Sequence, residues 1–157
     1  MIDVVNLQRK VKLETAVFKR YVKELSSAVE EANGKTFSVA FVSDDRMWKL
    51  NWSFRGKDST TDVLSFPHEA DEFKSKSDGF SRSDDDTPEG VTLTFLGDIV
   101  ISADQAQKQA KENKLSLENE IKQLILHGLL HLCGYDHETD KGQMNKRELA
   151  LRKKLGI

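Results

Sequence analysis

The sequence feature that most constrains the fold is an apolar helix in the carboxyl-terminal part of the chain. The pattern predicts a helix that begins after the N-cap Ser116 and ends near Cys133. Its apolar residues point in nearly every direction around the axis: Leu124, Ile125, Leu126, Leu129, Leu130 and Leu132. A helix apolar nearly all round is a buried helix, because its surface has to be kept from water. We therefore expect this helix to lie inside the core.

The other segments predict a small mixed β-sheet with helices packed against it. Strands are expected at 2–7 (an edge strand), 36–42, 63–66 and 91–102, the last with a break at Gly97-Asp98. Helices are expected at 13–32, 44–53, from a capping box at 102–105 to 113, and from Thr139 or Asp140 to Leu155. This order predicts an α+β fold, and the length of 157 residues predicts a single domain spanning 1–157.

The segment 69–90 differs from the rest of the chain in composition. It holds eight acidic and three basic residues, is rich in serine and aspartate, and shows no apolar periodicity. Such a segment cannot bury enough apolar surface to order itself, so we expect a mobile acidic loop. The whole chain has a net charge of -2, which gives no global signature of a nucleic-acid binder.

The compartment follows from what the sequence contains. Cys133 is the single cysteine, so an internal disulfide cannot form. No apolar run approaches the length of a membrane span, and the first residues do not resemble a signal peptide. We expect a cytoplasmic protein without a membrane partner.

Three of the four histidines lie within eleven residues, at 127, 131 and 137. On a helix, His127 and His131 stand four residues apart, about 40° around the axis and about 6 Å along it, so their imidazoles share one face. Gly134 can end the helix in a left-handed conformation, after which His137 can return to the same point. The spacing therefore predicts a metal site on the central helix and the turn that follows it.

The number of histidine ligands indicates the kind of metal site. Three histidine ligands without a fourth protein ligand leave one position for water, which is typical of catalytic zinc. Zinc lowers the pKa of bound water and polarises a bound oxygen. We expect one Zn²⁺ per chain and a hydrolytic activity.

The histidine spacing is that of the metzincin proteases, but the residue after the first histidine is not. Those enzymes have glutamate there as general base, whereas this chain has Gly128. Met144 follows His137 by seven residues, as either a hydrophobic floor under the metal or a core residue. A zinc peptidase would need another base, such as Glu138.

The run from His127 to His137, HGLLHLCGYDH, resembles the histidine motif of the YbeY family, the bacterial endoribonucleases of rRNA maturation. Two further segments are similar in order and spacing: 50–67, LNWSFRGKDSTTDVLSFP, and 96–102, LGDIVIS. The likeness extends over nearly the whole chain. The departure is the acidic segment 69–90, which looks longer than the family's usual connection.

This resemblance implies an α+β fold, zinc at the three histidines, and metal-dependent cleavage of single-stranded RNA. It implies maturation of the 16S rRNA 3′ end and ribosome quality control. The partners it implies are rRNA, the small ribosomal subunit, a small-subunit protein and an rRNA-binding GTPase. Arg55 is the residue carried over as catalytic, because a bidentate guanidinium stabilises charge that builds on phosphate oxygens. Asp62 and Asp98 either orient metal ligands or cap turns.

Two other functions stay open at this stage. One is a zinc peptidase with an atypical base, which the glycine at position 128 argues against. The other is a non-catalytic ribosome-assembly factor whose zinc is structural.

Overall fold

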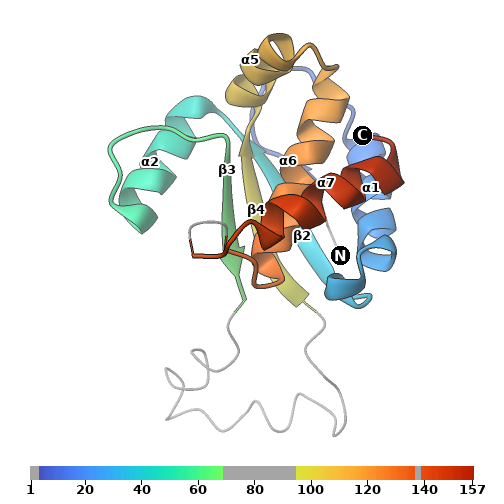
Figure 1. The fold of residues 1–157 in the computed structure, drawn as a ribbon. Helices are drawn as coiled ribbons and strands as arrows, with labels where there is room; N and C mark the ends of the chain where they lie inside the picture. Colours follow the sequence, from blue (N-terminus) through green and yellow to red (C-terminus); the bar gives the residue numbers. More distant parts are fainter. Residues whose placement is uncertain (1–3, 69–94, 137–138) are drawn as a thin grey trace, which may run out of the picture.

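A computed structural model describes residues 4–68, 95–136 and 139–157. Within them, a four-stranded sheet has the order β1-β2-β4-β3 (Figure 1). The strands are β1 (Val4–Asn6), β2 (Thr36–Val42), β3 (Val63–Pro67) and β4 (Phe95–Ser102). β1, β2 and β4 run parallel, and β3 pairs antiparallel with β4. The predicted mixed sheet is confirmed, and the predicted acidic loop at 69–90 lies outside the described residues.

The expected break at Gly97-Asp98 is a β-bulge inside one continuous strand. Thr36 pairs with Phe95 and Ser38 with Asp98, so one residue of β2 faces two of β4. Gly97 has a φ of 145°, and a Cβ there would lie 2.3 Å from the carbonyl oxygen of Phe66. Only glycine fits this position, because neighbouring backbone occupies the space of a side chain.

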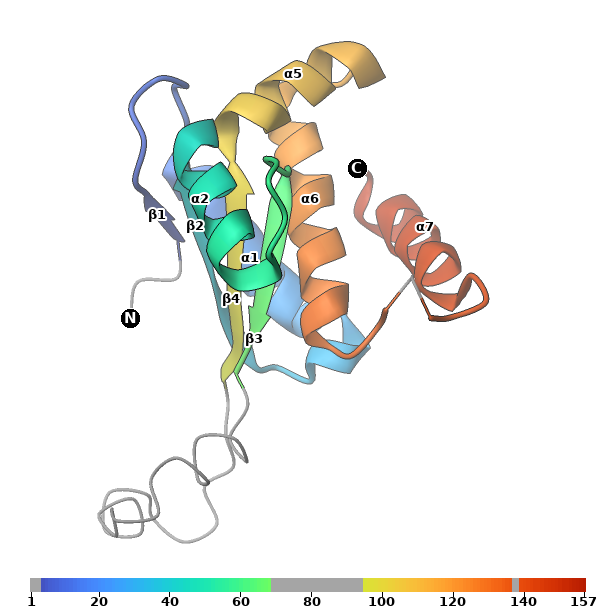
Figure 2. The ribbon, with the colours of Figure 1, turned by 90° about the vertical axis from the view of Figure 1, so that its left-hand side faces the viewer.

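Helices cover both faces of the sheet (Figure 2). The helix α2 (Asp44–Arg55) lies on one face, and α1 (Thr15–Ala28) and α6 (Leu117–Leu132) lie on the other. The helix α5 (Ala103–Asn113) follows β4 directly, and α7 (Gln143–Leu155) packs on the outer side of α6. The expected helix 13–32 is divided, since a short 3-10 helix, η1 (Glu30–Ala32), follows α1.

Side chains cap the amino-terminal ends of the helices largely as the sequence predicts. Ser116 accepts a hydrogen bond from the backbone N–H of Asn119, and Ser102 accepts one from that of Gln105. The last helix starts later than predicted, at Gln143. The Asp140 carboxylate accepts from the N–H groups of Gly142 and Met144, so the aspartate caps the helix from a preceding turn.

The core lies mainly between the sheet and α1 and α6. Ile121, Ile125, Leu126, Leu129 and Leu130 of α6 are fully buried, which confirms the expectation of a buried helix. A smaller apolar cluster between α2 and the opposite face contains Val42, Met47, Leu64 and Val100. None of the helices in the described ranges is long and apolar enough to cross a bilayer.

Candidate active site

Two of the three predicted metal ligands meet at the carboxyl-terminal end of α6. His127 and His131 stand one turn apart, and their Nε2 atoms are 3.2 Å from each other. The two rings are nearly perpendicular, with an interplanar angle of 76°. His137 lies outside the described residues. The helical spacing therefore brings two imidazole nitrogens to one point, as predicted.

The second ring nitrogen of His127 is held by α7. Its Nδ1 is 2.7 Å from Oε1 of Glu148, a buried carboxylate whose other oxygen accepts from Arg152. Burial by itself would raise the pKa of Glu148. The hydrogen bond with His127 and the charge of Arg152 outweigh burial and hold this pKa below its usual value. A charged Glu148 fixes the proton of His127 on Nδ1 and turns Nε2 towards its partner histidine.

The second ring nitrogen of His131 is held by the turn after α6. Its Nδ1 lies 3.0 Å from the carbonyl oxygen of Tyr135. A carbonyl can only accept, so His131 donates from Nδ1 and its Nε2 is the nitrogen that carries a lone pair. In both His127 and His131, Nε2 is therefore the ring nitrogen directed at the other histidine.

The turn at Tyr135 is tied to two further elements. The Tyr135 hydroxyl donates to Oε2 of Glu31 at 2.8 Å, and Arg147 of α7 binds both oxygens of Glu31 at 2.8 and 2.9 Å. The Arg147 guanidinium, together with the Tyr135 hydroxyl, lowers the pKa of Glu31 to about 2. This network joins η1, α7 and the turn that leads towards His137.

The distance between the two Nε2 atoms is compatible with a shared metal ion. Two nitrogens bound to a tetrahedral zinc at about 2.0–2.1 Å lie about 3.3 Å apart, close to the 3.2 Å observed. Across residues 4–68, 95–136 and 139–157, no group of three metal-ligating side chains is found. A third ligand would have to come from outside these ranges, where His137 lies.

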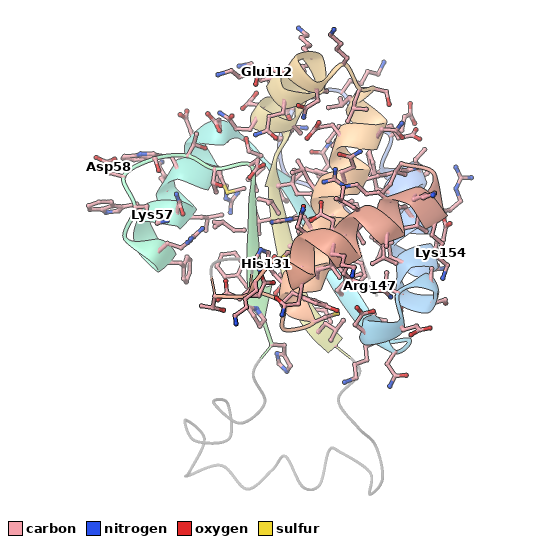
Figure 3. All side chains as sticks on the ribbon, viewed as in Figure 1. Lys57, Asp58, Glu112, His131, Arg147 and Lys154 are labelled. Atoms are coloured by element: carbon pink, nitrogen blue, oxygen red, sulfur yellow. The ribbon has the colours of Figure 1, made fainter. Side chains whose placement is uncertain are left out.

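Both imidazoles open into a cavity of about 700 Å³ between α6 and β3 with the turn before it. The opposite wall carries Arg55 and Lys57, at the end of α2 and just after it. Figure 3 shows Lys57 and Asp58 on the α2 side, with β3 between them and His131. Asp62 lines this cavity and a second one of about 470 Å³, which His127 also borders. Arg55 thus lines the same cavity as the histidine pair.

The turn that carries Lys57 is anchored to α2 at several points. Trp48 donates from Nε1 to Asp58 at 2.9 Å, and the Asn51 amide donates to the Ser59 carbonyl at 2.8 Å. Thr60 donates to the Asp44 carboxylate at 2.5 Å. Gly56 ends α2 with a φ of 66°, a left-handed conformation that suits glycine. The Arg-Gly-Lys-Asp turn is therefore held in place although its side chains are exposed.

Close packing between α6 and the sheet explains why residue 128 is glycine. A Cβ at Gly128 would lie 2.8 Å from Cγ2 of Ile99 in β4, so α6 and the sheet touch closely here. The Gly128 carbonyl also accepts a hydrogen bond from Ser65 of β3 at 3.1 Å. A side chain at this position would point at the sheet, so the general base of a metzincin has no room here.

The other residues singled out in the sequence, Met144, Cys133, Asp98 and His68, do not line this cavity. Met144 is buried in the main core, so packing is the role that the structure supports. Burial raises the pKa of the Cys133 thiol to about 11, which fits a core residue. Asp98 accepts a hydrogen bond from Ser38 of β2. The exposed His68 lies against Phe95 with ring centroids 5.7 Å apart.

Sequence reasoning missed Glu148 as the partner of His127. A signal was present, since Met144, Glu148 and Leu151 share one face of α7, and Met144 and Leu151 are core residues. A glutamate on an apolar stripe is expected to have a buried polar partner.

The fold and site define a class of protein: an α+β domain with an anchored histidine pair in a cavity that Arg55 and Lys57 also line. Comparisons with known proteins specify this class. The sequence model described as "Endoribonuclease YbeY" matches residues 3–156. The endoribonuclease YbeY of Nautilia profundicola is 40% identical over 136 residues, which cover 87% of this chain and 84% of that protein. That of Solibacter usitatus is 37% identical over 145 residues, covering 92% and 82%.

A solved structure also resembles this chain in fold. The solution structure of TM1509 from Thermotoga maritima has a TM-score of 0.57 and 26% identity, and covers 96% of this chain and 85% of that one. The chain therefore belongs to the endoribonuclease YbeY family.

Proposed function

We propose that this protein is a zinc-dependent endoribonuclease that cleaves single-stranded RNA, matures the 3′ end of 16S rRNA and acts in ribosome quality control. The observation that carries the proposal is the pair of Nε2 atoms 3.2 Å apart, each anchored through Nδ1, facing Arg55 and Lys57 across one cavity. The chain's membership of a family of endoribonucleases supports RNA as the substrate.

In this proposal His127, His131 and His137 hold the metal, one ion per chain. When bound, zinc supplies an activated water and polarises an oxygen of the scissile phosphate. Glu148 and the Tyr135 carbonyl keep the two imidazoles in the tautomer that binds a metal through Nε2. The partners of the two described histidines favour a preorganised site.

Arg55 acts on the substrate from the opposite wall. Its guanidinium binds two phosphate oxygens at once and stabilises the charge that builds on them during cleavage. Lys57 adds a second cation at the same wall and helps to attract the RNA backbone. The proposed partners are rRNA, the small ribosomal subunit with one of its proteins, and an rRNA-binding GTPase, in the cytoplasm.

The test compares substrates and metal states of the purified protein. A single-stranded RNA with a 16S rRNA 3′-end precursor sequence, the same RNA as a duplex, and a peptide mixture are each incubated with and without chelator. We expect cleavage of the single strand alone, lost with chelator and restored by zinc. Cleavage of peptides would instead support the peptidase. Metal binding without cleavage of any substrate would support the assembly factor.

A further inference from the structure

The outward side of α2 exposes an unusual amount of aromatic surface. Trp48 is 41% exposed and Trp52 is 54% exposed, and these are the two tryptophans of the whole chain. The neighbouring side of α2, about 100° around the helix axis from the indoles, is buried through Met47 and Asn51. Large exposed aromatic residues on one helix face are a mark of a binding surface.

This aromatic surface continues into the cavity. Trp48, Trp52 and Arg55 are spaced four and three residues apart, so they follow one another along one face of the helix. Arg55, at the end of this row, lines the wall that faces His127 and His131. An extended ligand bound at the histidines can therefore pass Arg55 and continue over the two indoles.

Cations alternate with the aromatic residues on this part of the molecule. Lys49, Arg55 and Lys57 are all exposed. Among the nearby acids, Asp45 is exposed on α2 one turn before Trp48. Asp58 accepts a hydrogen bond from Trp48, and Asp44 accepts from Thr60, Ser102 and Gln105. Exposed cations interleaved with aromatic rings suit a ligand with a negative backbone and flat bases.

The spacing of the indoles favours an unpaired strand. Trp48 and Trp52 lie one turn apart, about 6 Å along the axis, which exceeds the roughly 3.4 Å spacing of stacked nucleotides along a duplex strand. Each ring would thus receive a separate base that has left its stack. The Trp48 indole is also held by its Nε1 bond to Asp58, which lowers the entropy cost of stacking on it.

We propose that Trp48 and Trp52 form a stacking platform for two bases of single-stranded RNA beside the scissile phosphate. The inference rests on the proposed nuclease function and adds a way to select single strands. A duplex keeps its bases paired inside the helix, so it cannot use the platform. The platform binds substrate and takes no part in the chemistry, so it affects KM rather than kcat.

Fluorescence tests the platform directly, because both tryptophans of the chain belong to it. Trp48→Phe leaves Trp52 as the single fluorophore, and Trp52→Phe leaves Trp48. Each variant is titrated with a 2′-O-methyl dodecauridylate, and separately with the same strand paired in a duplex. We expect saturable quenching by the single strand in both variants, weaker at higher salt, and little quenching by the duplex.

Kinetics supply the second readout. For a cleavable single-stranded dodecamer, Trp52→Ala is expected to raise KM about 5-fold or more, with kcat within about 2-fold of wild type. Trp52→Tyr retains a ring and is expected to keep most of the affinity. Leu149→Ala is the matched control, because Leu149 is 52% exposed on α7 and lies away from α2. A dinucleotide that fills the cavity alone is expected to have the same KM in all variants.

The outcomes separate this proposal from the proposed function. Quenching by single strands without any cleavage would keep the platform and reject the nuclease. Cleavage by wild type, with no quenching and an unchanged KM in Trp48→Ala and Trp52→Ala, would overturn the platform and leave the face for a protein partner. Circular dichroism checks that each variant is folded.

Discussion

The two walls of the cavity are built in opposite ways. The histidine wall, formed by α6, α7 and the turn at Tyr135, has every functional group tied to a second group: His127 to Glu148, His131 to Tyr135, and Tyr135 to Glu31. The α2 wall has a fixed backbone, but the side chains of Arg55 and Lys57 are exposed to water. One wall is rigid down to its side chains, and the other is rigid only in its main chain.

This difference indicates a division of labour. A metal site needs ligands fixed within a fraction of an ångström, so its residues are held by partners behind them. A surface that receives a long, flexible polyanion gains from long cationic side chains that can adjust to it. Substitutions in the histidine wall should therefore change metal binding and stability. Substitutions in the α2 wall should change catalysis and leave metal binding and stability unaffected.

The largest effect is expected from removing a histidine ligand. His131→Ala should lose essentially all bound zinc and all RNA cleavage, because two remaining ligands do not hold a catalytic metal. Stability should also fall, since metal binding adds to folding free energy. Elemental analysis and thermal unfolding measure both. His68→Ala, an exposed histidine outside the cavity, is the control and should keep about one zinc per chain. Full zinc content in His131→Ala would reject the site.

The next effect tests the α2 wall. Arg55→Ala should lower kcat about 100-fold or more, the usual cost of one preorganised charge-stabilising donor. Zinc content and melting temperature should stay at wild-type values. Arg55→Lys should restore only part of the rate, because lysine keeps the charge but loses the planar, two-pronged geometry.

Arg46→Ala is the matched control for Arg55, since Arg46 is an exposed arginine on the same helix that does not line the cavity. Steady-state rates with a single-stranded RNA decide the comparison. Wild-type activity in Arg55→Ala would remove Arg55 from the mechanism.

An intermediate effect is expected from the residue behind the first histidine. Glu148→Gln keeps the shape of the side chain but removes the charge that fixes the His127 tautomer. We expect zinc affinity to fall about 10- to 100-fold, measured by competition with a chelating dye. Glu112→Gln, an exposed glutamate on α5, should leave the affinity unchanged. An unchanged affinity in Glu148→Gln would mean that the backbone alone orients His127.

The smallest effect is expected from the network that holds the Tyr135 turn. The pKa of Glu31 is lowered to about 2 in the folded protein, so the charged form stabilises the fold at neutral pH. That contribution is complete above the ordinary glutamate pKa of about 4.5 and is lost as the pH falls towards 2. Glu31→Gln should lower the free energy of unfolding at pH 7 by about 1–2 kcal/mol, a value reduced for solvent screening of the pair.

Urea unfolding at pH 7 and at pH 3 measures this dependence. The difference in stability between wild type and Glu31→Gln should shrink at the lower pH. Glu30→Gln changes the exposed neighbouring glutamate and should behave like wild type. A constant difference at both pH values would show that Glu31 stabilises the fold through packing rather than charge.

The sequence alone determined the elements that depend on local pattern. The strand at 36–42 was predicted with its observed bounds, and Ser102 and Ser116 were predicted as caps, because alternation and capping act over a few residues. The start of α7 was misplaced by about three residues, since Thr139 or Asp140 was expected to begin the helix and Gln143 does. Asp140 caps the helix instead from a turn closed by its bonds to Gly142 and Met144.

The same division applies to the site. The pairing of His127 and His131 follows from a four-residue spacing on one helix, so it can be read from the sequence. The contact of Glu148 with His127, 21 residues away, and the place of Arg55 across the cavity depend on how α7 and α2 pack around the sheet. The tertiary structure decided these, because contacts between distant segments depend on the path of the whole chain rather than on local periodicity.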